Sequence, residues 1–209
     1  MLLTLLLTLQ GTPLDTLRVR SIDRRPLPQD RVDSLRYGAP QIRLVTRQGT
    51  ALVWFLRAAD TVFVAASIPD STRYWGDDFV LSFDTRGDAA GSPQHDDFQW
   101  YFRRAIDSSV VFRGRNGRWE PPKGDPDWRL GNARSGGGWE MSATDGPRGW
   151  TMLLRLDPAW FAGESGRRPR VAFRIYDDSP SGWFSWPPPP GNTPASSVEE
   201  TPSLWVPVR

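Results

Sequence analysis

The sequence predicts an antiparallel β-sandwich of the jelly-roll kind, folded as a single all-β domain with long loops. Short apolar or alternating runs recur along the chain, each bounded by Gly, Pro, Asp or Ser. No window of helical length keeps an apolar stripe at the i, i+3, i+4, i+7 spacing. The 209 residues suit one all-β domain or a small two-domain protein, and no domain boundary or internal repeat is visible.

The chain begins with an apolar segment, residues 1–12, that resembles the core of an export signal. It opens with MLLTLLLTLQ, but it has neither a basic start nor a small-residue cleavage site. The run is too short to span a bilayer as a helix. We therefore expect no transmembrane span and favour export to the periplasm or the exterior, with a first core strand as the alternative. The folded domain is expected over residues 13–209.

The predicted strands alternate in a way that assigns side chains to the core or to the opposite face. In DDFQWYF, Phe98, Trp100 and Phe102 share one face. Asp97, Gln99 and Tyr101 share the other. The predicted strands are residues 49–56, 60–68, 77–84, 96–102, 108–114, 149–156, 170–178 and 203–208.

Three further segments are not predicted as strands. Residues 157–163, DPAWFAG, are the best candidate for a short helix, because Asp157 can cap it and Pro158 suits its first turn. Residues 121–140 and 182–202 are too rich in Gly or Pro for strands. Long loops of this kind in compact domains are usually functional or disordered.

Composition excludes several function classes. The chain has no cysteine, so thiol catalysis, disulfides and cysteine metal sites are absent. Its one histidine, His95, lies in an acidic loop, and no GxSxG motif presents a serine nucleophile. The net charge is only +2, without the concentrated basic patches of a nucleic-acid-binding protein. No catalytic constellation emerges, and the sequence predicts a non-catalytic protein.

Four carboxylates within one connection between strands predict a hard-cation site. Asp84, Asp88, Asp96 and Asp97 lie in FDTRGDAAGSPQHDD. Calcium takes six to eight oxygen ligands from carboxylates and loop carbonyls. The spacing does not match an EF-hand, and acids that only keep a loop solvated are the alternative. Structural calcium is therefore the one cofactor expected.

The 11 Trp residues are more than a sandwich core of this size needs. Trp54 and Trp205 lie in apolar runs and are expected in the core. Sugar rings stack on indole faces, and their hydroxyls bond to planar polar side chains. A small core under a long loop is the alternative for any single Trp. The Trp residues at loop or strand-edge positions are Trp75, Trp119, Trp128, Trp139, Trp183 and Trp186.

From about residue 20 to the C-terminus, an ordered set of motifs resembles the family 9 carbohydrate-binding modules and related β-sandwich domains. The segment YWGDDFVLSFD resembles the family's Trp, Gly-Asp and alternating strand, and DDFQWYF resembles its Gln-bearing strand. GWTMLLRLDPAWF and RVAFRIYDDSPSGWFSWPPPPGNTP resemble the later strands, the acidic turn and the Trp that follow.

The resemblance implies a site in which two Trp rings, here Trp75 and Trp186, enclose the terminal sugar of a chain. It also implies structural calcium, a partner glycoside hydrolase and polar contacts to the sugar. The residues expected to make those polar contacts are Gln99, Tyr101 and Arg174. Two positions depart from the pattern: Val80 stands where members often carry Glu, and Arg174 where Asn is common.

Three hypotheses follow from these patterns. The first is a non-catalytic carbohydrate-binding domain linked to polysaccharide or glycan use. The second, favoured by Val80, is a structural or interaction β-sandwich that has lost sugar binding. The third is a haem-binding electron-transfer sandwich, for which His95 is the only available histidine ligand.

Overall fold

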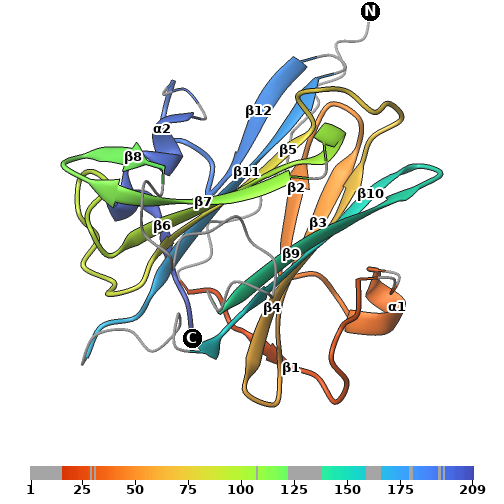
Figure 1. The fold of residues 1–209 in the computed structure, drawn as a ribbon, viewed down its shortest axis with the longest axis horizontal. Coiled ribbons are helices and arrows are strands. Elements are labelled where there is room, and N and C mark those ends of the chain that lie inside the picture. The colour runs from red at the N-terminus through yellow and green to blue at the C-terminus, as the bar shows by residue number, and fades with distance from the viewer. Residues whose placement is uncertain are drawn as a thin grey trace, which may run out of the picture.

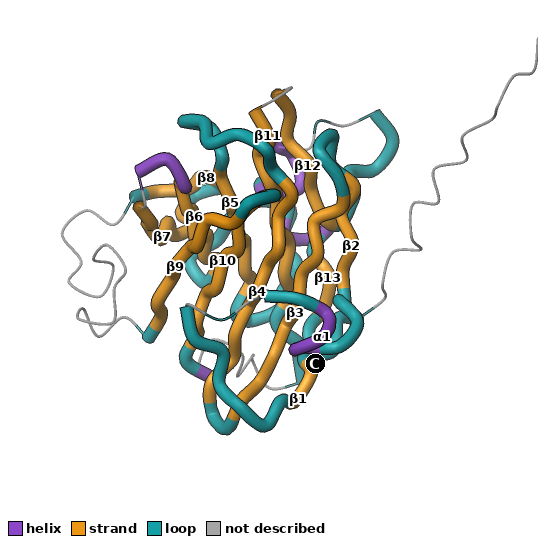
Figure 2. The backbone as a smooth tube through the Cα atoms, turned by 90° about the vertical axis from the view of Figure 1, so that its right-hand side faces the viewer, coloured by secondary structure: helices purple, strands orange, loops and turns teal. Residues whose placement is uncertain are grey.

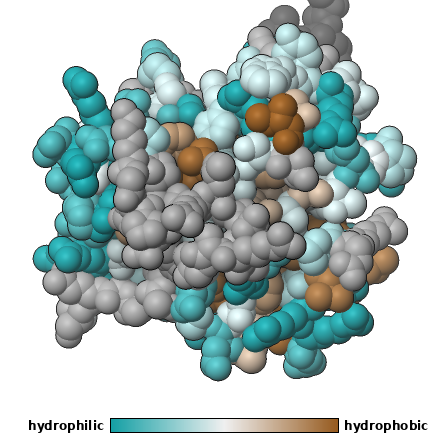
Figure 3. All heavy atoms as spheres, in the orientation of Figure 1, coloured by the Kyte–Doolittle hydropathy of each residue, from teal (hydrophilic) through white to brown (hydrophobic). Residues whose placement is uncertain are grey.

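Two β-sheets pack face to face in the computed structural model of the chain (Figure 1). The structure describes residues 16–209, except 29, 31, 107, 122–137, 159–165, 179–180, 193 and 195. No helix among the described residues is long and apolar enough to cross a membrane. The described part of the face in Figure 3 is mostly hydrophilic, with separate small apolar areas.

The first sheet has six strands, and all its pairs are antiparallel except that of β1 with β3. A segment that includes the helix α1 (Ser34–Tyr37) crosses its outer face (Figure 2), where Tyr37 packs edge-on against Trp54. The strands, in spatial order, are β1 (Arg20–Ser21), β3 (Thr50–Ala58), β4 (Thr61–Pro69), β10 (Gly149–Leu156) and β9 (Trp139–Gly146), with β2 (Ile42–Val45) paired to β3.

The second sheet has seven strands, and all its pairs are antiparallel. The short helix α2 (Ser196–Glu199) packs on β11 and β12, and the 3-10 turns η1 (Arg104–Ile106) and η5 (Pro202–Leu204) flank strands. The strands, in spatial order, are β12 (Ser181–Trp186), β11 (Arg170–Asp178), β5 (Asp78–Asp84), β6 (Asp97–Arg103), β7 (Ser108–Arg115) and β8 (Arg118–Glu120), with β13 (Val206–Pro207) paired to β11.

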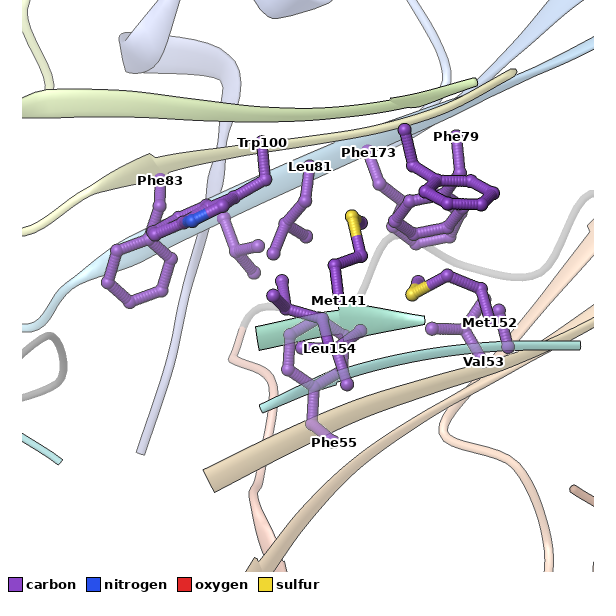
Figure 4. Close-up of a cluster of buried hydrophobic side chains, with 14 of the residues drawn as sticks. Val53, Phe55, Phe79, Leu81, Phe83, Trp100, Met141, Met152, Leu154 and Phe173 are labelled. Carbon is purple, nitrogen blue, oxygen red and sulfur yellow. The ribbon is translucent and has the colours of Figure 1, made fainter. Parts of the chain in front are cut away.

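The main hydrophobic core lies between the sheets. Alternating residues of β5 and β6, such as Phe79, Leu81 and Trp100, point toward the first sheet, from which Met141 and Met152 point back (Figure 4). These side chains are almost fully buried. The alternate residues of the second sheet therefore face away from the core, and this outer face carries the chemistry described below.

The β-sandwich predicted from the sequence is confirmed. Five of the described strands were not predicted from the sequence. β1, β2 and β8 are only two to four residues long, and β9 and β12 each adjoin a Gly-rich or Pro-rich segment, which obscured their alternation. In β9, Trp139 and Met141 are buried in the core. Residues 203–208 form η5 and then β13 instead of one strand. The apolar segment 1–12 and most of the helix predicted at 157–163 lie outside the described residues.

Candidate functional site

One row of side chains crosses the outer face of the second sheet at the end where β5 begins. Trp183 on β12 lies opposite Tyr176 on β11, and Tyr176 lies opposite Asp78 on β5. Asp78 lies opposite Arg103 at the end of β6 and accepts a 3.2 Å hydrogen bond from its Nε. The ring centroids of Tyr176 and Trp183 are 4.7 Å apart. The row thus combines aromatic surface with a charge pair.

The loop between β4 and β5 brings Trp75 to this row. The Trp75 side chain is 57% exposed, and the Arg103 guanidinium carbon lies 4.9 Å from its ring centroid. The next residue, Gly76, lies directly against Tyr176, since a Cβ at this position would be 2.5 Å from a Tyr176 ring carbon. Only glycine permits that approach. Trp75 therefore offers an exposed ring beside a wall of aromatic and charged groups.

A second row lies one step further along the same face. Ser185, Arg174, Val80 and Tyr101 are neighbours across β12, β11, β5 and β6. The Arg174 guanidinium carbon lies 3.7 Å from the centroid of the Trp183 ring and covers it. Val80, which stands where the resemblance leads one to expect Glu, is fully buried and offers no polar group. The polar groups of this row come from its other members.

Tyr101 connects the two rows. Its hydroxyl donates a hydrogen bond to Asp78 and accepts one of 3.1 Å from Arg103 Nη2. Burial, and then the bond to Asp78, raise the pKa of Tyr101 to about 12. The phenol is thus neutral at physiological pH and stays a hydrogen-bond donor.

Glu199, on α2, contacts both Gln99 and Arg174, and the three side chains form one polar cluster. Its Oε2 lies 2.5 Å from Arg174 Nη2 and accepts a 3.3 Å hydrogen bond from Gln99 Nε2, which also donates to Ser82 Oγ at 3.4 Å. Burial raises the pKa of Glu199 to about 7, although the nearby Arg174 acts in the opposite direction. Glu199 was not predicted from the sequence, because no local pattern in residues 182–202 shows that α2 returns to this sheet.

Two buried polar atoms in the second row have no hydrogen-bond partner among the described residues. They are Arg174 Nε and Ser185 Oγ, and the residues that carry them are directly paired across β11 and β12. Buried polar groups are usually bonded to protein, water or ligand. The second row therefore retains hydrogen-bonding capacity that the described part of the chain does not use.

Trp186, expected as the second sugar wall, lies on the other face of the sheet. It pairs with Phe173 and stacks on it, with ring centroids 5.6 Å apart, and only 8% of the residue is exposed. The physical reason is parity: Trp183 and Trp186 are three residues apart in β12, so they point to opposite faces. The structure brings Trp75 and Tyr101 against Arg103, and Arg174 with Gln99, but it places Trp186 in the core.

The four predicted metal ligands gather at the opposite end of the outer face. Carboxylate oxygens of Asp84, Asp88 and Asp96 lie within 4.8 Å of one another, and Asp97 lies opposite Asp84 on neighbouring strands. The pKa of Asp97 is raised to about 8, mainly by burial and in addition by the three other carboxylates, although the hydrogen bond from the Gln94 amide acts in the opposite direction.

The donor set at this end fits a hard cation. Asp84 accepts hydrogen bonds from the amides of Gly87 and Ala89, which orients its carboxylate. Asp96 Oδ2 and Asp97 Oδ1 are buried and have no hydrogen-bond partner among the described residues. All the ligands are oxygens, as calcium prefers. A cation held here would offset the repulsion among the buried carboxylates.

The described geometry does not bring together a His and Met pair for haem. His95 Nδ1 lies 2.7 Å from Arg113 Nη2 in an exposed loop. Met141 and Met152 are buried in the core between the sheets. Neither described methionine is therefore placed to join His95 as an axial ligand.

No protein-family model and no curated protein matches this sequence. Among solved structures, the fold is similar to that of a family 9 carbohydrate-binding module from Caldicellulosiruptor kristjanssonii in complex with glucose, at 16% identity and a TM-score of 0.57. That match covers 93% of this chain and 95% of the module. A family 9 carbohydrate-binding module from the same organism in complex with cellotriose matches at 17% identity and a TM-score of 0.57, over 93% of this chain and 92% of that one. At such identities the likeness establishes the fold, which is that of this class of β-sandwich.

Proposed function

We propose that this domain binds carbohydrate without catalysing a reaction, through the end of the outer face where Trp75 lies. The observation that carries the proposal is the exposure of Trp75 beside two rows of polar and aromatic side chains. An exposed indole face is a good platform for the C–H groups of a sugar ring. The glucose and cellotriose complexes of modules with this fold support the same ligand class.

In this proposal Trp75 is the stacking ring, and Trp183 contributes only a ring edge. Trp75 lies beside the row that contains Trp183, since Gly76 touches Tyr176 and Tyr176 contacts Trp183. Trp186 supports this arrangement from the core side, where it packs on Phe173. Because the Arg174 guanidinium covers Trp183, we propose that the sugar stacks on Trp75 and meets Trp183 only at the edge of its ring.

Gln99, Tyr101 and Arg174 supply the hydrogen bonds to sugar hydroxyls in this proposal. Tyr101 and Arg174 lie in one row, and Gln99 is linked to Arg174 by the Glu199 carboxylate. The buried Arg174 Nε and Ser185 Oγ are the groups with unused bonding capacity.

The proposal extends to calcium and to cellular context. Calcium at Asp84, Asp88, Asp96 and Asp97 would be structural, because these residues lie at the far end of the face from Trp75. Residues 1–12 support export, and a ligand of this class supports a role in polysaccharide or glycan use beside a glycoside hydrolase.

Isothermal titration calorimetry with glucose and cello-oligosaccharides tests the function. The wild type is expected to release heat with a saturable isotherm, and Trp75→Ala is expected to weaken binding by about tenfold or more, the scale of one lost aromatic stacking contact. Other plant, bacterial and storage glycans extend the panel.

Leu35→Ala is the matched control, because Leu35 is an exposed apolar residue on α1, at the first sheet. It should leave the isotherm unchanged. No heat with any glycan, together with unchanged Trp fluorescence, would overturn the proposal. That result would favour the structural or interaction sandwich, to which the buried Val80 and the Arg174-covered ring of Trp183 also point.

A further inference from the structure

A buried arginine lies directly behind the Trp75 loop. Arg104, in η1, follows Arg103, and its side chain is only 6% exposed. Its Nη1 donates to Asp70 Oδ2 at 2.7 Å and to Asp77 Oδ2 at 3.0 Å, and its Nε donates to Asp145 Oδ1 at 2.7 Å. One guanidinium thus joins both ends of the β4–β5 loop to the β9–β10 hairpin.

The Trp75 turn is closed by the same carboxylate that Arg104 holds. The amide of Tyr74 donates to Asp77 Oδ2 at 2.8 Å, and the amide of Asp77 donates to the carbonyl of Tyr74 at 3.3 Å. Trp75 and Gly76 are therefore the two central residues of a short turn. Arg104 also bonds the segment's backbone, since its Nη1 donates to the Thr72 carbonyl and its amide donates to the Asp77 carbonyl.

Two consecutive residues therefore contact the Trp75 turn from different sides. Arg103 places its guanidinium over the Trp75 ring on the outer face. Arg104 points away from that face, lies 5.6 Å from the Trp150 ring centroid, and holds the turn's carboxylate from behind. The Asp77 side chain is 1% exposed and that of Asp70 is 4% exposed, so water cannot replace these bonds.

We propose that Arg104 is a positioning residue for sugar binding: it fixes residues 70–77 so that the Trp75 ring is held ready for the ligand. The inference rests on the proposed function, and Arg104 itself does not touch the sugar. A ring ordered in advance binds more tightly, because less conformational entropy is lost when the ligand arrives. Lysine cannot replace Arg104, because an ammonium group does not present the planar fork that spans several acceptors.

The test compares Arg104→Lys with the wild type at a temperature at which both are folded by near-ultraviolet circular dichroism. Amide hydrogen exchange in residues 70–77 is expected to become about tenfold faster, with β3 and β11 unchanged, as for a local opening. The dissociation constant for cellotriose is expected to rise about tenfold. The control is Arg155→Lys, which alters an Arg–Glu140 pair on the first sheet and should change neither measurement.

A double-mutant cycle with Trp75→Phe separates positioning from a general structural role. If Arg104 acts through Trp75, then Arg104→Lys weakens binding less in the Trp75→Phe background than in the wild type. An equal loss in both backgrounds, or faster exchange with unchanged affinity, overturns the inference. If Arg104→Lys does not fold, Asp145→Asn takes its place in the cycle, because Asp145 is half exposed and holds only one edge of the guanidinium.

The two proposals fail in different ways. A wild type that binds no glycan refutes the sugar site, whatever the exchange data show. In that case hydrogen exchange tests the claim that Arg104 fixes residues 70–77. Unchanged exchange rates in this segment of Arg104→Lys refute that claim, and faster rates confined to the segment support it.

Discussion

Trp75 and Trp186, the two rings predicted to enclose a sugar, differ in how far they are exposed to solvent. Trp75 is 57% exposed beside Arg103, whereas Trp186 is 8% exposed and stacks on Phe173. Both occur in loop-like sequence next to Gly or Pro, so local composition does not show which of them faces a ligand and which is buried. Exposure separates a ring available to a ligand from one that fills the core.

The stability of two alanine variants checks this difference. Trp186→Ala is expected to lower the free energy of unfolding by about 3–5 kcal/mol, as for large aromatic residues removed from a core. Trp75→Ala is expected to change it by less than about 0.5 kcal/mol, as for exposed positions. Urea unfolding followed by circular dichroism measures both. Equal losses in the two variants would contradict the assignment.

The titration of Glu199 gives a pH-dependent prediction. Burial raises its pKa from 4.5 to about 7, so the folded state holds the Glu199 proton more tightly than the unfolded state does. The resulting stabilisation is complete below about pH 4.5 and is lost as pH rises through about 7. The free energy of unfolding of the wild type, minus that of Glu199→Gln, is therefore expected to fall across this range.

Urea titrations at several pH values between 4 and 8 measure the difference. Taking the difference removes the contribution of the other buried carboxylates, which titrate in both proteins. Glu140→Gln is the control, because Glu140 pairs with Arg155 on the first sheet, away from Glu199. A difference that rises with pH would show that the Arg174 ion pair, and not burial, dominates.

At the scale of elements, glycine in β7 sets the position of the acidic loop. A Cβ on Gly114 would lie 2.2 Å from the Gln94 carbonyl oxygen. The backbone of Gln94 bonds to Asp97 twice: its amide donates to Asp97 Oδ2, and its carbonyl accepts from the Asp97 amide. The strand thus packs directly on the turn that holds two of the predicted metal ligands, Asp96 and Asp97.

Gly114→Ala is expected to displace that turn and to lower the free energy of unfolding by about 1–3 kcal/mol, the usual cost of overpacking. It is also expected to weaken any calcium binding by the acidic cluster. Gly91→Ala is the matched control, because its Cβ would meet nothing within 4 Å. Thermal unfolding with and without calcium measures both effects. If the two variants behave alike, the close approach at Gly114 has no energetic consequence.

At the scale of the whole molecule, calcium is expected to stabilise the fold. A cation that binds only the folded state at about 100 times its dissociation constant adds about 2.7 kcal/mol. For a domain of this size that corresponds to an increase in Tm of about 5–10 °C. Differential scanning calorimetry in EDTA and in excess calcium measures the shift.

Asp88→Asn tests the site itself, because Asp88 is exposed and its removal should not disturb packing. The variant is expected to unfold at nearly the wild-type temperature in EDTA and to lose most of the increase in calcium. Asp60→Asn, an exposed acidic residue in the β3–β4 turn, is the control. An equal calcium effect in Asp88→Asn would contradict the proposed ligand set.

The sequence by itself determined the sandwich, because alternation along a strand fixes which residues face the core. Phe98, Trp100 and Phe102 were placed correctly from alternation alone, and the acidic cluster follows from carboxylates at the two ends of one connection. β9 and β12 were missed because Gly-rich and Pro-rich neighbours obscured the same alternation.

Only the tertiary structure decided which groups meet on the outer face. Trp183 stands in the row with Tyr176, and Trp186 fills the core, because of the register of β12 against β11. Glu199 reaches Arg174 and Gln99 because α2 folds back onto the sheet. Arg104 joins Asp70 and Asp77, at the two ends of the β4–β5 loop, to Asp145 in β9. Such contacts depend on strand pairing and chain return over long separations, which local residue patterns do not encode.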